Sequence, residues 1–128
     1  MTQTAVNEVL ARWSENFGQG NVEGMVALYS PQALFYGSNA VLLRGKEGVR
    51  AYFTKNLTSP GKMGVGFRDV AIEPVGENHV NLAGVAAFRV GTQEVPMRLT
   101  FTLVREDGEW LIATHHASLT PVIEGVTS

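Results

Sequence analysis

The chain of 128 residues contains no cysteine, so it can form neither disulfides nor thiolate metal sites. It has no run of basic residues and a formal net charge of −2, which argues against a nucleic-acid surface. No apolar stretch approaches the roughly 20 residues of a membrane span, and the N-terminus has no apolar signal core. We therefore expect a cytoplasmic protein without nucleic-acid or membrane partners.

Metal-ligating histidines are scarce as well. Two of the three histidines, His115 and His116, are adjacent, and in a strand they would point to opposite faces. His79 stands alone near a predicted turn. These positions cannot supply one metal with several ligands, so we expect neither a metal nor a cofactor.

What is present begins with helical patterns. Apolar residues at helical spacing, Trp13 among them, predict an amphipathic helix over residues 4–17. Asn21 is a suitable N-cap for a second helix over residues 22–29, and Pro31 would end it. We expect Trp13 to be largely buried.

The rest of the chain reads mainly as strands. A third helix is predicted over residues 46–57, and Asp107-Gly108 indicates a tight hairpin. The predicted extended segments are residues 33–36, 41–43, 66–74, 79–90, 95–105 and 110–119. Helices that come first and antiparallel strands that follow predict an α+β fold, and the absence of a linker predicts one domain over residues 1–128.

Three stretches, spread over nearly the whole chain, resemble a known superfamily. Residues 12–29, and Gly45 followed by Tyr52-Phe53, resemble the opening of nuclear transport factor 2-like proteins, which have a cystatin-like fold. The ending, residues 107–112 and then His116-Ala117-Ser118, resembles the SnoaL-like branch related to the association domain of calcium/calmodulin-dependent protein kinase II. The resemblance implies a cone-shaped, curved antiparallel sheet wrapped around the N-terminal helices, with a pocket inside.

The resemblance does not supply a catalytic residue. The steroid isomerases and polyketide cyclases of this superfamily use a carboxylate base after the first strand and a tyrosine on the first helix. The matching positions hold Gly37 or Ser38 for the carboxylate and Trp13 for the tyrosine. Neither glycine nor serine can replace a carboxylate base, so we expect no steroid isomerase activity.

The resemblance also assigns pocket residues. Arg50 and Arg89 match arginines that reach into the pocket of the kinase association domain, and Arg98 lies near a third such position. Inward arginines would attract an anion such as a carboxylate. The alternative for Arg89 and Arg98 is the outer face of the sheet.

Which of His115 and His116 faces inward depends on the hairpin at Asp107-Gly108: a two-residue turn directs His116 inward, whereas a three-residue loop with a bulge reverses this. His116 is favoured because it matches the histidine-x-serine ending of the family, although it would equally serve as a structural histidine.

Three aromatic residues, Trp13, Tyr36 and Tyr52, are expected to line the pocket or to fill the core. We predict a homodimer that pairs through its mixed sheet face, which carries Arg98, Thr100 and Thr102. The leading function is a pocket for an unknown small molecule, with a carboxylate or other anion as a candidate. The alternatives are an enzyme on a polyketide-like substrate, with His116 as acid or base, and an oligomerisation module.

Overall fold

A six-stranded sheet and three helices make up the described part of the protein. The computed structural model describes residues 2–38 and 40–121. The elements are α1 (Thr2–Gln19), α2 (Val22–Val26), β1 (Tyr29–Tyr36), β2 (Leu43–Arg44), α3 (Gly45–Asn56), β3 (Met63–Pro74), β4 (His79–Val90), β5 (Gln93–Glu106) and β6 (Glu109–Leu119). The fold is α+β, as predicted, and none of the described helices is both long and apolar enough to span a bilayer.

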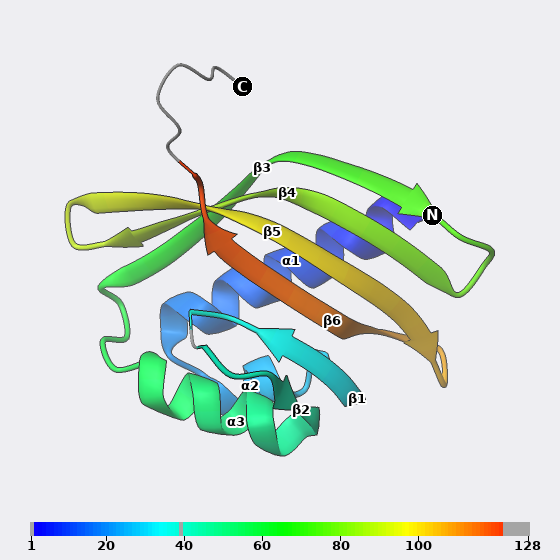
Figure 1. Cartoon of the computed structure of the whole chain (residues 1–128), viewed down its shortest axis with the longest axis horizontal. Helices are drawn as coiled ribbons and strands as arrows, with labels where there is room; N and C mark the ends of the chain where they lie inside the picture. The colour runs from blue at the N-terminus through cyan, green and yellow to red at the C-terminus, as the bar shows by residue number, and fades with distance from the viewer. Residues whose placement is uncertain (1, 39, 122–128) are drawn as a thin grey trace.

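The sheet is open and mixed. Its strand order is β2-β1-β6-β5-β4-β3, so β2 and β3 form its two edges. Strands β3 to β6 form an antiparallel meander, as the sequence predicted, whereas β1 runs parallel to β6. Figure 1 shows α1 lying across one face of the long strands, with α2 and α3 gathered beside β1 and β2.

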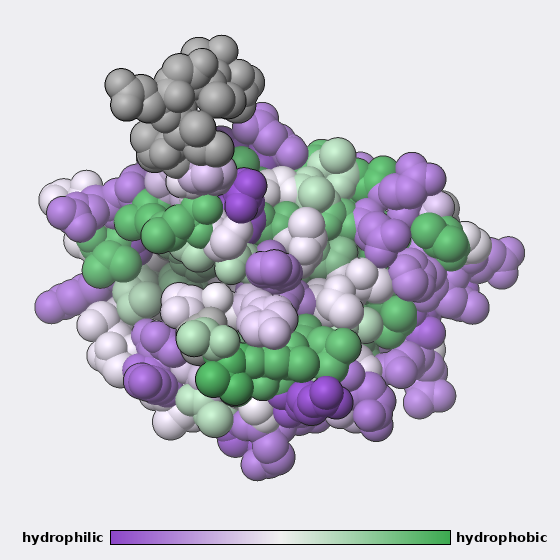
Figure 2. Space-filling view, in the orientation of Figure 1, coloured by the Kyte–Doolittle hydropathy of each residue, from purple (hydrophilic) through white to green (hydrophobic). Residues whose placement is uncertain are grey.

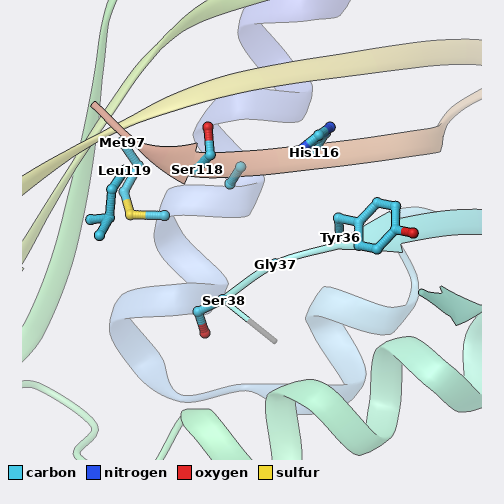
Figure 3. A pocket seen from close by; sticks show the side chains of 8 residues that line it. Tyr36, Gly37, Ser38, Met97, His116, Ser118 and Leu119 are labelled. Carbon is cyan, nitrogen blue, oxygen red and sulfur yellow. The ribbon is translucent and has the colours of Figure 1, made fainter. Parts of the chain in front are cut away.

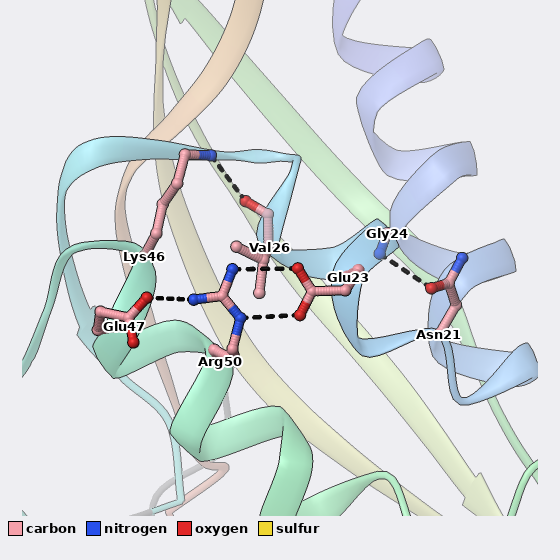
Figure 4. Close-up of polar contacts among 7 residues, drawn as sticks. All are labelled: Asn21, Glu23, Gly24, Val26, Lys46, Glu47 and Arg50. Carbon is pink, nitrogen blue, oxygen red and sulfur yellow. Dashed lines mark hydrogen bonds and ion pairs between the residues drawn. The ribbon is translucent and has the colours of Figure 1, made fainter.

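The helices follow the apolar pattern closely. The buried side chains of α1 recur at helical spacing and include Trp13, which is 2% exposed. The helix ends where Gly20 adopts a φ of 66°, a conformation that suits glycine. Asn21 caps α2 as predicted, because its side-chain oxygen accepts a hydrogen bond from the backbone of Gly24 at 3.0 Å (Figure 4).

The second helix is shorter than predicted. It ends at Val26 rather than Tyr29, and Tyr29 begins strand β1. Proline disfavours the helical conformation in the residue before it, so Pro31 pushes Ser30 into extended backbone. Lys46 then holds this junction, since its ammonium donates to the carbonyls of Val26 at 3.0 Å and Tyr29 at 2.8 Å.

The β5–β6 hairpin closes as predicted and then departs from regular pairing. Asp107 and Gly108 form its two-residue turn with φ values of 51° and 80°. Leu103 pairs with Ile112, but the next residue, Thr102, pairs with Thr114. Ala113 is therefore the extra residue of a β-bulge, and the side-chain alternation beyond it is shifted by one.

Candidate ligand pocket

A cavity of about 260 Å³ lies between α1, α3 and the inner face of the sheet. Most of its lining is apolar or aromatic, as in small-molecule sites generally. The lining residues are Trp13, Phe17, Gly37, Ser38, Tyr52, Phe53, Asn56, Met63, Phe88, Val90, Val95, Met97, His115 and Ala117. This space is called the inner pocket below.

A second hollow, the outer groove, opens where the C-terminal ends of β1 and β6 lie close to β5 (Figure 3). It is lined by Tyr36, Gly37, Ser38, Met97, His116, Ala117, Ser118 and Leu119. Gly37, Ser38, Met97 and Ala117 line both spaces. The inner pocket and the outer groove therefore share a rim.

His115 is the titratable group that reaches the inner pocket from β6. Its side chain is 5% exposed, and its Nδ1 lies 2.8 Å from the hydroxyl of Tyr29. The ring of Phe35 stacks on it with centroids 4.1 Å apart, and Phe101 lies at 4.9 Å. These contacts fix both the plane of the imidazole and the direction of its nitrogens.

Burial favours the uncharged form of the His115 imidazole. Desolvation, with a smaller contribution from neighbouring His116, lowers the pKa of His115 from 6.5 to about 3. Burial likewise raises the pKa of Tyr29 well above its usual value, although the hydrogen bond from Trp13 opposes this shift. At neutral pH the imidazole and the phenol are therefore both uncharged.

A hydroxyl pair adds polarity at the shared rim. The hydroxyl of Tyr52 lies 2.9 Å from that of Ser38 and accepts a hydrogen bond from the Ser38 backbone N–H at 3.1 Å. Gly37 allows this approach, because a Cβ there would lie 2.6 Å from the Tyr52 ring and 2.7 Å from Phe35. Asn56 donates to the Tyr52 carbonyl at 2.8 Å, so its amide is held as well.

The predicted inward orientation of His116 is wrong. Its neighbour His115 pairs with Phe101 on the buried face, whereas His116 is exposed on the outer face beside Tyr36, with ring centroids 5.5 Å apart. The hairpin turn was predicted correctly, but the bulge at Ala113 reverses which histidine faces inward. Of the three predicted aromatic residues, Trp13 and Tyr52 line the inner pocket, and Tyr36 lines the outer groove.

None of the three predicted arginines lines the inner pocket, and Arg98 instead lines a hollow on the outer face together with His116. Arg89 and Arg98 fall on the outer side of their strands, where the Arg89 guanidinium lies over Gly64 and Arg98 donates to Ser118 at 3.2 Å. The adjacent residues in each strand point inward, so sequence parity alone excludes these arginines from the pocket. The described lining of the inner pocket therefore offers no arginine to an anion.

Arg50 belongs to an ion-pair cluster between α2 and α3 (Figure 4). Its guanidinium contacts both carboxylate oxygens of Glu23, at 2.8 and 3.0 Å, and also pairs with Glu47. The hydrogen bond from Arg50 lowers the pKa of Glu23, and the same contact raises that of Arg50. Arg50 is therefore satisfied by carboxylates of this chain and faces away from the inner pocket.

The sequence did not reveal the role of His115 and Tyr29. Tyr29 was predicted to end a helix, and His116 was favoured over His115 for the inward position. For Tyr29, the available signal was the extended backbone that Pro31 favours before it. For His115, no local signal marks the bulge that turns its side chain inward. Among the described residues, no group of three metal-ligating side chains comes together.

Comparison with known proteins identifies the family. The model of the SnoaL-like domain matches residues 6–123. The chain belongs to the SnoaL-like family. A search of curated proteins finds no match.

Solved structures agree in fold. A Xanthomonas campestris protein named for the calcium/calmodulin-dependent protein kinase II association domain is 24% identical, with 92% of this chain and 87% of that chain covered and a TM-score of 0.85. A Novosphingobium aromaticivorans protein named for scytalone dehydratase is 14% identical, with 99% and 89% covered and a TM-score of 0.83. A cystatin-like-fold protein from Nostoc punctiforme is 14% identical, with 97% and 95% covered and a TM-score of 0.81. The predicted nuclear transport factor 2-like, cystatin-like fold is thus confirmed for this SnoaL-like chain.

Proposed function

We propose that this SnoaL-like protein binds a small, uncharged and largely apolar molecule in the inner pocket. The observation that carries the proposal is the lining, which includes no charged side chain among the described residues. Its histidine is held neutral by burial. Transferring an ion into such a space without a partner would cost several kcal/mol or more, so a neutral ligand fits better than a carboxylate.

The volume limits the size of the ligand. At about 260 Å³ the inner pocket lies slightly below the roughly 300–1,000 Å³ of typical small-molecule sites. A bicyclic compound such as 1-tetralone is a suitable probe, with 1-naphthoate as an anion of similar shape. Trp13 lines the pocket, so its fluorescence reports binding once the other tryptophan is removed by Trp110→Phe.

We expect 1-tetralone to change Trp13 fluorescence with a dissociation constant on the order of 0.1 mM, since small ligands gain limited energy per atom. Binding of 1-naphthoate should be weaker by about tenfold or more. Ala117→Phe, which fills the inner pocket, should weaken the binding of 1-tetralone at least tenfold.

The matched control is Ser118→Phe on the same strand, because Ser118 lines the outer groove and not the inner pocket. Circular dichroism would establish that both variants fold. Equal binding of the two probes, or equal loss in the two variants, would contradict the proposal.

The homodimer remains a proposal that concerns the outer sheet face. Figure 2 shows that face with pale, weakly polar side chains interspersed with hydrophobic ones. Tyr36 and Leu34 are each 40% exposed there, and the outward residues of β5 include Thr100 and Thr102. The guanidinium of Arg98 is already hydrogen-bonded to Ser118. Exposed apolar and hydroxyl side chains on one sheet face suit contact with a second copy of the chain.

We expect sedimentation equilibrium to give the mass of a dimer at micromolar concentration. Thr100→Glu would place a carboxylate on each copy in the middle of this face, and it should weaken the dimer at least tenfold. Thr92→Glu in the exposed β4–β5 turn is the charge-matched control and should leave the mass unchanged. A monomeric native protein would contradict the proposed dimer.

A further inference from the structure

The hydroxyl of Tyr29 stands between two nitrogen atoms in the core. Trp13 Nε1 lies 3.0 Å from it, and His115 Nδ1 lies 2.8 Å from it on the other side. An indole N–H can only donate, so the Tyr29 oxygen is the acceptor of the first bond. The hydroxyl proton of Tyr29 is then available for the hydrogen bond with His115 Nδ1.

The second bond fixes a proton on the imidazole. Tyr29 is fully buried, and His115 Nδ1 is the one further hydrogen-bond partner found for its hydroxyl in the described part of the chain. If Nδ1 carried the proton, both neighbours would donate to Tyr29, and its own proton would lack an acceptor. Buried donors are rarely left in that state. Tyr29 therefore donates to Nδ1, and the proton of the neutral ring lies on Nε2.

Nε2 is directed toward the inner pocket. His115 lines that pocket, and its hydrogen bond to Tyr29 uses the other ring nitrogen. No fully buried side-chain nitrogen or oxygen of the described residues lacks a partner. Because Nε2 has no hydrogen bond among those residues, it must retain contact with accessible space. The hydrogen bond to Tyr29 fixes this direction, and the stacked ring of Phe35 holds the plane of the imidazole.

We infer that Trp13 and Tyr29 act as positioning residues that hold His115 in its Nε2–H tautomer, so that the inner pocket presents a hydrogen-bond donor to a carbonyl oxygen of the ligand. This inference rests on the proposed function and adds its chemical selectivity. Neutral ketones and related carbonyl compounds are favoured over hydrocarbons of the same shape, because the ligand oxygen satisfies Nε2–H in a mostly apolar site.

The tautomer is tested without any ligand. Protein labelled with ¹⁵N-histidine at pH 7 should show, in long-range ¹H–¹⁵N spectra, a His115 ring protonated at Nε2 and bare at Nδ1. Tyr29→Phe removes the donor to Nδ1 and should give a mixture of tautomers. Tyr36→Phe is the matched control, since that hydroxyl lies on the outer face beside His116, and it should leave His115 unchanged. A His115 ring protonated mainly at Nδ1, or at both nitrogens, would overturn the inference.

Selectivity is tested with 1-tetralone and tetralin, which share a skeleton and differ by one carbonyl oxygen. In the Trp110→Phe background we expect 1-tetralone to bind about tenfold more tightly than tetralin, as one hydrogen bond in an apolar site provides. Tyr29→Phe should reduce that preference to about threefold or less, because Nε2 is then protonated in only part of the molecules. Tyr36→Phe should leave the preference unchanged.

The tautomer spectra and the binding measurements distinguish failure of the inferred selectivity from failure of the proposed function. Equal affinity for the two compounds with the expected tautomer would overturn the carbonyl selectivity and leave the pocket proposal intact. Binding of neither compound would overturn the proposed function and the ligand class together. The tautomer would still be decided by the spectra alone.

Discussion

Lowering the pH from 7.5 to 5 will reduce the free energy of unfolding by about 2 kcal/mol through His115 alone. The unfolded chain takes up a proton at this histidine near its ordinary pKa of 6.5, whereas the folded protein does so only near 3. Between these values the unfolded state binds more protons than the folded state, so stability falls as the pH falls. The loss should continue below pH 5 until the buried imidazole is itself protonated.

Between pH 7.5 and 5 the change in stability reports mainly on His115, because unperturbed carboxylates titrate mainly below pH 5. Chemical denaturation at several pH values measures the slope. His115→Gln removes the titrating group while keeping an acceptor for Tyr29, so this variant should be nearly flat over the range. His116→Gln, one residue away on the exposed face, is the matched control and should keep the slope. A native protein whose stability does not change would show that the imidazole titrates normally.

Trp13→Ala will destabilise the protein by about 3–5 kcal/mol, the usual cost of removing a large buried ring. The indole is 2% exposed and stacks on Phe17 with centroids 5.3 Å apart. Phe53 and Phe88 contact it edge-on at 6.0 Å. The substitution also removes the hydrogen bond to Tyr29. Urea denaturation at pH 7.5 measures the loss.

Trp110 provides the comparison, because it is only partly buried and covered by Arg105, whose guanidinium lies 5.7 Å from its ring. Trp110→Ala should therefore cost clearly less than Trp13→Ala. Trp13→Phe retains a ring and loses the N–H group, so the difference between the two Trp13 variants separates packing from hydrogen bonding. A loss below about 1 kcal/mol for Trp13→Ala would mean that the indole mainly borders open space.

The sequence predicted those features of the fold that depend on local pattern. Strand β4 was predicted with its observed bounds, and the Asp107-Gly108 turn was predicted from its dipeptide. The parallel pairing of β1 with β6 was not predicted, because pairing between segments distant in sequence leaves no local signal. Tyr29 illustrates a boundary error: its side chain fits a helical stripe as well as a strand, and tertiary contacts decide between them.

The site was harder to predict because its residues depend on register. Helical spacing alone directs Trp13 and Tyr52 inward, and both border the inner pocket. His115 and His116 could not be distinguished, because one extra residue upstream exchanges their faces. The arginines were assigned by resemblance, and Arg89 and Arg98 lie where the alternation of their own strands puts them. Alternation was therefore a better guide than resemblance for these residues.

The bulge at Ala113 also determines where strand β6 can lose a residue without a change of register. Loss of one residue from a central strand ordinarily reverses every side chain on one flank. Here Ile112 already faces Leu103, and Thr114 already faces Thr102, with Ala113 as the surplus between them. A chain that lost Ala113 would keep both pairings, and His115 would remain opposite Phe101. Residue 113 is thus a position in the middle of the sheet where a natural deletion would leave the inner pocket and its imidazole in place.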